Sequence, residues 1–309
     1  MVDTHGIPVL DFGAWHSDGL PRARFVQALG ASLSRYGFVV ITGHGVDQAV
    51  IDRAFATAAE VFALPERAKH LYQHPECAFQ RGYTPFGREK ARGQYASDLK
   101  EFWHVGRDLP MDHPYRVRGL MADNDFPAEV PAFASAMRHL FAAQERFALG
   151  LLAAIARFLG VDPTQFLDLV EDGNSVLRVI NYPDIEGAPP PGAVRAAAHE
   201  DINLLTVLPT ATRPGLQLLT PEGTWLDIEA PPGAMVCDTG DMMALLTNGR
   251  LPATTHRVIN PGGADGGRMS MPFFLHPHPD AILAPLDGSA PGRPAHEVLA
   301  ERLRENNVG

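Results

Sequence analysis

The hydrophobic pattern of this 309-residue chain changes period after Gly173, and this change limits the possible folds more than any other feature. Before it, apolar residues recur every three or four positions, as in amphipathic helices. After it, short β-like segments alternate with turn signals, at about 175–182, 202–208, 215–219, 224–228, 234–238, 253–259 and 268–275. The sequence therefore predicts an α+β protein in which a helical N-terminal region packs on a double-stranded β-helix, the jelly-roll form.

Three parts are expected along the chain, and together they form one structural unit. They are a helical region, a jelly-roll core, and a final helix with its tail, at residues 1–173, 174–285 and 286–309. In the first part, apolar spacing predicts a long helix from Pro131 to Leu159, ended by Gly160. The stretch 73–100 has no clear period, and long ordered loops in enzymes are often functional.

A histidine and a carboxylate stand two residues apart in a strand-like stretch, as His199 and Asp201. In a strand, residues i and i+2 point to the same face, roughly 6.6 Å apart along the chain, so these side chains can converge on one cation. His256 supplies a second imidazole from another strand-like run. Two imidazoles and one carboxylate, with other positions open, are the ligand set of non-haem Fe(II) oxygenases, although zinc would suit the same ligands.

The His-x-Asp pair, the distant His256 and the pair Arg268-x-Ser270, in this order, resemble the isopenicillin-N-synthase-like branch of the Fe(II)/2-oxoglutarate dioxygenases. The resemblance covers nearly the whole chain. It includes a "YGFxxxxGHG" stretch at residues 36–45, Asn248-Gly249-Arg250, and His256-Arg257-Val258. The individual pieces are common in proteins, but the ordered set is specific.

This resemblance implies an oxidoreductase that holds Fe(II) through His199, Asp201 and His256. It also implies that 2-oxoglutarate chelates the metal through its 1-carboxylate and 2-keto oxygen, that O2 is consumed, and that succinate and CO2 are released. The far carboxylate of the co-substrate would meet Arg268 and Ser270, because a guanidinium can hold a carboxylate by two parallel hydrogen bonds. A zinc hydrolase or a cupin-type isomerase is the structural rival, but a zinc hydrolase needs neither residue. Hydroxylation of a small organic substrate is the default outcome, and desaturation or ring closure stays open.

Four further residues are candidates by their position in the strands. Tyr182 resembles the family tyrosine whose hydroxyl also reaches the far carboxylate, with core packing as the alternative. Arg178 shares the face of Tyr182 and would contact substrate or pair with an acid outside the barrel. Asn203 continues the face of the His-x-Asp pair, and Phe274 follows from Ser270 by period two. Asn203 and Phe274 are candidate substrate contacts.

Two rival functions stay open. One is an oxidase that resembles isopenicillin N synthase itself and uses no 2-oxoglutarate, so that Arg268 and Ser270 would grip a substrate carboxylate instead. The other is a jelly-roll binding protein that keeps the triad but performs no oxidation. Succinate formation separates both from the main interpretation.

The overall composition excludes several classes of partner. A formal net charge of −10 argues against a nucleic-acid-binding surface. No run approaches the roughly 18 apolar residues of a membrane span, and the first eight residues lack the pattern of a signal peptide. Two cysteines, Cys77 and Cys237, give no disulfide framework. We therefore expect a cytoplasmic protein with a small-molecule substrate, and the oligomeric state stays open.

Overall fold

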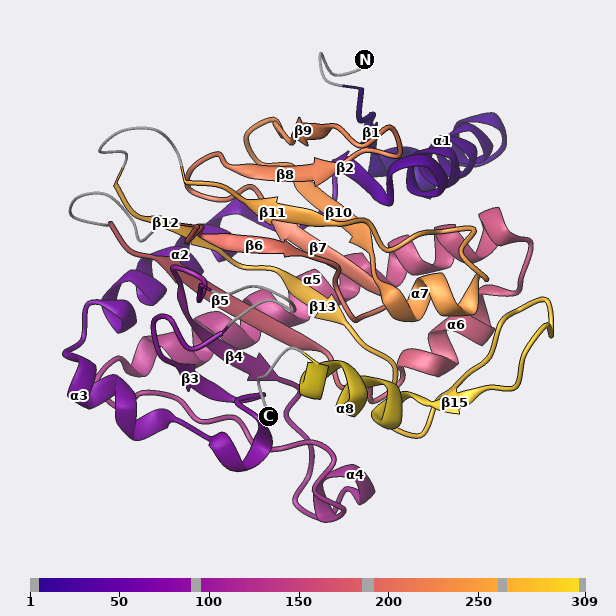
Figure 1. Ribbon diagram of the computed structural model, residues 1–309. Helices are drawn as coiled ribbons and strands as arrows, with labels where there is room; N and C mark the ends of the chain where they lie inside the picture. The colour runs from indigo at the N-terminus through magenta and orange to yellow at the C-terminus, as the bar shows by residue number, and fades with distance from the viewer. Residues whose placement is uncertain (1–5, 90–95, 185–191, 261–265, 306–309) are drawn as a thin grey trace.

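A computed structural model describes residues 6–89, 96–184, 192–260 and 266–305. Within these ranges, all strands except one separate pair form two sheets that face each other (Figure 1). The larger sheet has nine strands, in the order β1-β2-β10-β7-β13-β5-β4-β3, and β12 also pairs with β5. Its strands are β1 (Val9–Asp11), β2 (Phe38–Thr42), β3 (Gly82–Thr84), β4 (Glu101–Gly106), β5 (Val176–Tyr182), β7 (Leu205–Pro209), β10 (Met235–Thr239), β12 (Arg268–Ser270) and β13 (Phe273–Leu275).

The smaller sheet has four described strands in the order β6-β11-β8-β9. They are β6 (Ala196–His199), β8 (Leu216–Leu219), β9 (Trp225–Asp227) and β11 (His256–Val258). Among the described strand pairs, β1 and β2 run parallel and the others are antiparallel, including a separate pair, β14 (Ile282–Leu283) and β15 (Arg293–Pro294). Two facing, mostly antiparallel sheets confirm the predicted jelly roll.

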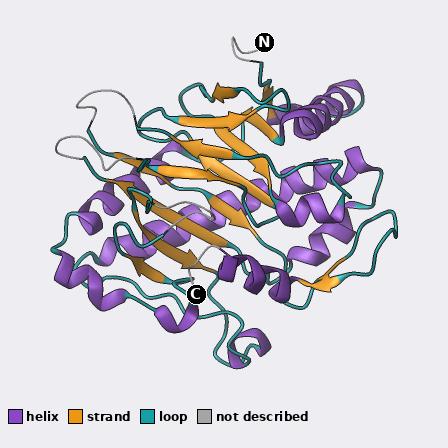
Figure 2. Cartoon of the chain, in the orientation of Figure 1, coloured by secondary structure: helices purple, strands orange, loops and turns teal. Residues whose placement is uncertain are grey.

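Helices cover the outer face of the larger sheet (Figures 1 and 2). The longest is α5 (Pro131–Leu159), which contacts β4, β5, β7 and β13, and its bounds are those expected from the sequence. Gly160 ends it in the left-handed conformation. Inside the apolar stripe of α5, the fully buried Gln144 donates to the carbonyl oxygens of Val207 at 3.2 Å and Met271 at 3.1 Å, so it ties the helix to the sheet.

The other helices pack around α5 or close the ends of the sandwich. Of the described helices, α1, α2 and α6 contact α5 directly. Their bounds are α1 (Leu20–Tyr36), α2 (Gln48–Phe62), α3 (Glu66–Lys69), α4 (Pro114–Val117), α6 (Pro163–Val170), α7 (Asp241–Leu246) and α8 (Ala295–Glu305), with 3-10 turns at Phe12–His16, His70–Tyr72 and Pro75–Cys77. No helix in the described ranges is long and apolar enough to cross a bilayer.

One expectation about local structure was wrong. His199 and Asp201 do not share a strand: β6 ends at His199, and β7 begins at Leu205 in the other sheet. The N-terminal region contains helices α1 to α6 and also contributes β1 to β4 to the larger sheet. The division at residues 173 and 285 therefore stays a prediction.

The buried apolar residues leave a cavity between the two sheets. One large cluster joins α1, α2 and α5 to the larger sheet, with members such as Leu29, Leu151 and Phe273. A smaller cluster of Phe102, Ile180, Tyr182, Ala196 and Val258 fills part of the space between the sheets. The rest of that space is lined by polar side chains from both sheets.

Candidate active site

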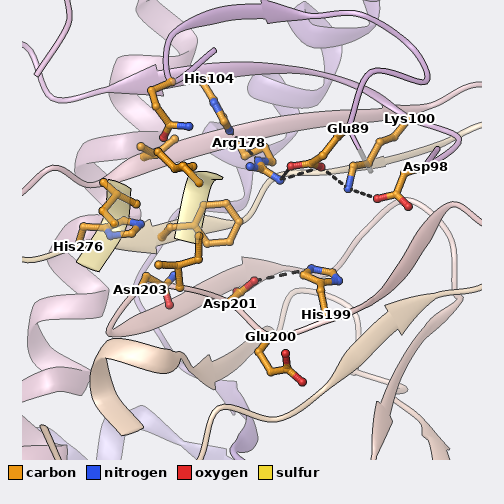
Figure 3. Close-up of a pocket in the computed structure, with 16 residues that line it drawn as sticks. Glu89, Asp98, Lys100, His104, Arg178, His199, Glu200, Asp201, Asn203 and His276 are labelled. Atoms are coloured by element: carbon orange, nitrogen blue, oxygen red, sulfur yellow. Dashed lines mark hydrogen bonds and ion pairs between the residues drawn. The ribbon is translucent and has the colours of Figure 1, made fainter. Parts of the chain in front are cut away.

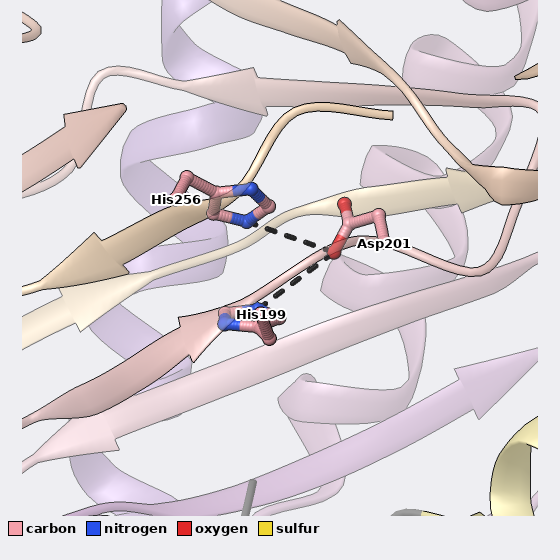
Figure 4. Close-up of side chains that lie close together, drawn as sticks. All are labelled: His199, Asp201 and His256. Atoms are coloured by element: carbon pink, nitrogen blue, oxygen red, sulfur yellow. Dashed lines mark ion pairs between the residues drawn. The ribbon is translucent and has the colours of Figure 1, made fainter. Parts of the chain in front are cut away.

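The three predicted metal ligands converge at one mouth of the sandwich (Figure 4). His199 and His256 stand directly opposite each other in the β6–β11 pair. Asp201 lies in the link that leads from β6 to the larger sheet. Its Oδ1 is 3.9 Å from Nε2 of His199 and 3.7 Å from Nε2 of His256, and the three ligand atoms lie within 4.8 Å of one another. A cation between them would be shared by all three side chains.

Backbone carbonyls orient both imidazoles. Nδ1 of His199 donates to the carbonyl of Ala197 at 2.7 Å, and Nδ1 of His256 donates to that of Thr254 at 3.0 Å. A carbonyl oxygen can only accept, so the proton is on Nδ1 and the Nε2 lone pair is left for a metal. Burial, followed by the charge of His256, lowers the pKa of His199 to about 4, which also favours the neutral ligand form.

A hydrogen-bonded chain holds the second oxygen of Asp201. The hydroxyl of Thr206 donates to Oδ2, and the side-chain amide of Asn203 donates to that hydroxyl at 2.9 Å. Burial would raise the pKa of Asp201, but His256, His199, the Thr206 hydrogen bond and Arg178 together outweigh burial, and the pKa is lowered. Burial and the charge of Asp201 raise the pKa of Asp238, on β10, well above its usual value. Asn203 thus holds Thr206, which in turn holds the predicted metal ligand Asp201. Asn203 also lines the outer part of the cavity, described below.

The inner part of the cavity, between the sheets, brings together the residues expected for the co-substrate. Arg268, Ser270 and Tyr182 line it along with the triad. Arg268 is 2% exposed, stands opposite Tyr182 in the β12–β5 pair, and has its guanidinium carbon 5.1 Å from the centre of the tyrosine ring. Its Nε donates to the carbonyl of Arg213, while Nη1 is buried without a partner among the described residues. A buried cation with an unused donor is a fitting site for an anionic group.

The outer part of the cavity lies on the other side of the triad and has a charged wall (Figure 3). Arg178 and His104 are register partners on β5 and β4, and Nε of Arg178 donates to Nε2 of His104 at 2.7 Å. Nη1 of Arg178 reaches Glu89 at 3.3 Å. Lys100 pairs with Glu89 at 2.6 Å and with Asp98 at 2.8 Å. Arg178 therefore lines this cavity, and its acid partner Glu89 lines it too.

Phe274 and Arg178 each line both the inner and the outer part of the cavity, so they lie where the two parts meet. Phe274 was expected to share the face of Ser270. Although the strand is interrupted at Met271 and Pro272, the residues Ser270, Pro272 and Phe274 all line the inner part of the cavity. His44, in the GHG part of the family stretch, is not among the three grouped ligand residues, and its Nε2 is hydrogen-bonded to the carbonyl of Gly233 at 2.7 Å.

Several lining residues were missed from the sequence. They are Gln80, Glu89, Asp98, Lys100, His276, Leu299 and Leu303. The sequence held a signal for Lys100, which comes directly before β4 and continues the alternation of Phe102 and His104 along one face of that strand. Glu101 and Asn181 face the other way, where their side chains are hydrogen-bonded at 2.8 Å. His276 carried no signal that would set it apart from other histidines.

Comparisons with known proteins point to one family. The family model described as "non-haem dioxygenase in morphine synthesis N-terminal" matches residues 7–129, and the family model described as "2OG-Fe(II) oxygenase superfamily" matches residues 174–277. A 2-oxoglutarate-Fe(II) type oxidoreductase of Emericella nidulans is 33% identical over 89% of this chain and 80% of its own. Another from Aspergillus fumigatus is 31% identical over 96% of this chain and 92% of its own.

Solved structures agree with these matches. A crystal structure of a 2OG-Fe(II) oxygenase family protein from Caulobacter crescentus has a TM-score of 0.88 and 42% identity, covering 98% of this chain and 99% of its own. The structure of a full-length Neurospora crassa protein in complex with alpha-KG and thymine has a TM-score of 0.84 and 26% identity, covering 98% of this chain and 97% of its own.

Proposed function

Because the chain belongs to the isopenicillin-N-synthase-like branch of the Fe(II)/2-oxoglutarate oxygenases, we propose that His199, Asp201 and His256 hold its iron. The protein is an oxidoreductase that uses Fe(II), 2-oxoglutarate and O2. The observation that carries the ligand assignment is the convergence of the three ligand atoms within 4.8 Å while both Nδ1 atoms are committed to carbonyls. This donor set fits Fe(II) with positions left open.

We further propose that Arg268, with Ser270 and Tyr182, binds the far carboxylate of 2-oxoglutarate. The unpartnered Nη1 of Arg268 supports this, since a buried donor with no acceptor is costly unless a ligand meets it. With iron and co-substrate bound, the chemistry they supply is the activation of O2 for oxidation of a C–H bond. The protein's own residues orient the ligands, hold the diacid, and keep water out of the cavity through apolar walls such as Phe274.

The substrate is a small molecule that we place in the outer part of the cavity, beside Arg178, Asn203 and Phe274. The Neurospora crassa structures in complex with alpha-KG and thymine or 5-formyluracil support a small organic molecule as the substrate. Hydroxylation is the expected outcome. The cytoplasmic location and the exclusion of nucleic acid and membrane partners stay predictions made from the sequence.

The test is anaerobic reconstitution with Fe(II), followed by oxygen, with and without 2-oxoglutarate. We expect succinate to form only when both iron and 2-oxoglutarate are present. An oxidase without 2-oxoglutarate would consume oxygen with no succinate, and a binding protein would do neither. His256→Ala should lose bound iron, and undiminished metal content in this variant would refute the ligand assignment.

A further inference from the structure

We propose that the outer part of the cavity selects an uncharged substrate that carries an amide-like group, such as a carboxamide, a lactam or an imide. The inference rests on the proposed function, because it assumes that iron and 2-oxoglutarate occupy the inner side. It is drawn from how the charged side chains of the cavity wall are paired and from which polar atoms they leave over.

The buried acids and bases of the wall neutralise one another. Two carboxylates, Glu89 and Asp98, face two cations, Lys100 and Arg178. The second oxygen of Asp98 accepts from the backbone N–H of Ala197 at 3.0 Å. Within the described part of the chain, each buried wall charge is therefore paired, and a charged ligand would find no counter-ion without breaking a buried pair.

Both histidines of the wall are neutral. Nδ1 of His104 donates to the carbonyl of Phe79 at 2.8 Å, so its Nε2 can accept from Arg178. Burial, followed by the charge of Arg178, lowers the pKa of His104 well below its usual value. Burial also lowers the pKa of His276 to about 4. Glu200 adds a carboxylate at the rim, but it is exposed and hydrogen-bonded to Thr255.

The inner side adds no excess charge when it is filled as proposed. The two positive charges of Fe(II) and the one on Arg268 are met by the two charges of 2-oxoglutarate and the one on Asp201. A substrate above the metal therefore faces a cavity that is balanced on both sides. A net charge on the substrate would be left without compensation in a poorly solvated place.

Several polar atoms of the outer part have no partner among the described residues, Oδ1 of Asn203 among them, and we assign two groups, Arg178 and His276, to the substrate. Nη2 of Arg178 takes part in none of the hydrogen bonds among the described residues, and the guanidinium carbon lies 5.4 Å from the ring centre of Phe274. His276 is 8% exposed, and its Nδ1 is buried without a partner in the described ranges. The substrate must accept from Arg178 and either donate to or accept from His276. An amide group offers both functions in one plane without a charge.

Apolar side chains close the rest of the space. Val176 and Phe274 come from the larger sheet, while Leu299 and Leu303 come from α8. These residues favour a hydrocarbon ring or chain next to the polar group. They also argue against a strongly hydrated ion as the ligand.

The test uses isosteric ligands that differ in charge. Two sets serve: benzamide, benzoate and benzamidine; and phenylacetamide, phenylacetate and phenylacetamidine. Each is titrated calorimetrically into the anaerobic protein loaded with Fe(II) and 2-oxoglutarate. We expect the amide of at least one set to bind at least about tenfold more tightly than its anion and its cation. Equal or tighter binding of an ionic member, or no binding of either amide, would overturn the proposal.

A charge-changing variant tests the cause. Glu89→Gln removes one negative charge from the wall at nearly constant shape, so the preference for amide over carboxylate should fall by about tenfold. Glu101→Gln is the matched control, since Glu101 is buried on the opposite face of the same sheet, against Lys69. The control should keep the preference of the wild type. An unchanged preference in folded Glu89→Gln would refute the charge argument.

A third variant tests the polar contact. His276→Phe should weaken amide binding by about tenfold and His276→Asn by less, because asparagine keeps a donor and an acceptor. A titration of the anaerobic Fe(II) protein with 2-oxoglutarate, made before the ligand sets are added, keeps the two proposals apart. If 2-oxoglutarate does not bind, the proposed function fails. If it binds and the ligand sets show no preference for the amides, the substrate class alone fails.

Discussion

Replacing Arg268 with alanine tests the co-substrate site most directly. Arg268 is 2% exposed, and its Nη1 has no partner within the described residues, whereas its Nε is already used by the carbonyl of Arg213. A carboxylate that enters this pocket therefore meets a fixed cation whose Nη1 can still donate hydrogen bonds. Arg268→Ala should leave that carboxylate buried and short of a partner.

The size of the effect follows from the burial and the remaining contacts. Truncating one partner of a buried charge pair costs about 2–5 kcal/mol. Ser270 and Tyr182 still line the pocket in the variant, so the lower end applies. About 2 kcal/mol corresponds to a roughly 30-fold higher requirement for 2-oxoglutarate. Arg268→Lys should recover part of the loss, because an ammonium cannot match both carboxylate oxygens.

The assay is succinate formation against 2-oxoglutarate concentration, together with iron content. Iron binding should stay close to that of the wild type. Arg257→Ala is the control: Arg257 follows the ligand His256 in β11, but it lies over the ring of Trp225 at 3.8 Å and is bonded to Gln217. Coincident curves for wild type and Arg268→Ala would refute the anchor, as would an equal loss in Arg257→Ala.

Three further variants probe the support of the site and the fold. Thr206→Val should weaken Fe(II) binding by about 10–100-fold in a metal titration, because it removes the hydrogen bond to Asp201; unchanged affinity would exclude that role. Burial would raise the pKa of Glu89, but its two cationic partners outweigh burial and lower it. The charge of Glu89 therefore stabilises the fold above the usual pKa of 4.5, and this stabilisation is lost as the pH falls toward the lower pKa of the folded protein. In urea unfolding, Glu89→Gln should be less stable than the wild type at about pH 7, and the difference in free energy of unfolding should disappear in acid. A difference that does not change with pH would contradict this. In urea unfolding, Gly37→Ala should lower the free energy of unfolding by at least about 1 kcal/mol more than Gly160→Ala does. Both glycines have positive φ, but a Cβ at Gly37 would lie 2.3 Å from Thr254. Outside its own helix and its chain neighbours, no heavy atom of the described residues lies within 4 Å of a Cβ at Gly160. Equal losses of stability would refute the steric argument.

Local signals predicted the elements whose ends depend on nearby residues. The bounds of α5 followed from Pro131 at its start and Gly160 after its end, since both act within one turn. The triad was predicted although the reason given was wrong. His199 and Asp201 converge because the chain crosses between sheets there, and a period-two pattern cannot show a crossover.

The place of Arg178 in the charged wall could not be predicted, because its partners lie in distant parts of the chain. Glu89 and Arg178 are 89 residues apart, and His104 and Arg178 are 74 apart. No local pattern fixes which acid meets which base over such separations. Leu299 and Leu303 of α8 were likewise invisible, because a helix pattern does not state which surface the helix covers.

The crossover after His199 gives the proposed iron a mechanical role. His199 and His256 belong to the smaller sheet, whereas Asp201 is hydrogen-bonded by Thr206 of the larger one. A bound ion therefore cross-links the two halves of the sandwich. With the ion bound, the smaller sheet could not separate from the larger one without breaking a metal–ligand bond, so we expect slower partial unfolding of β6 and β11 in the loaded protein. Hydrogen exchange in these strands thereby reports how much of the protein carries iron.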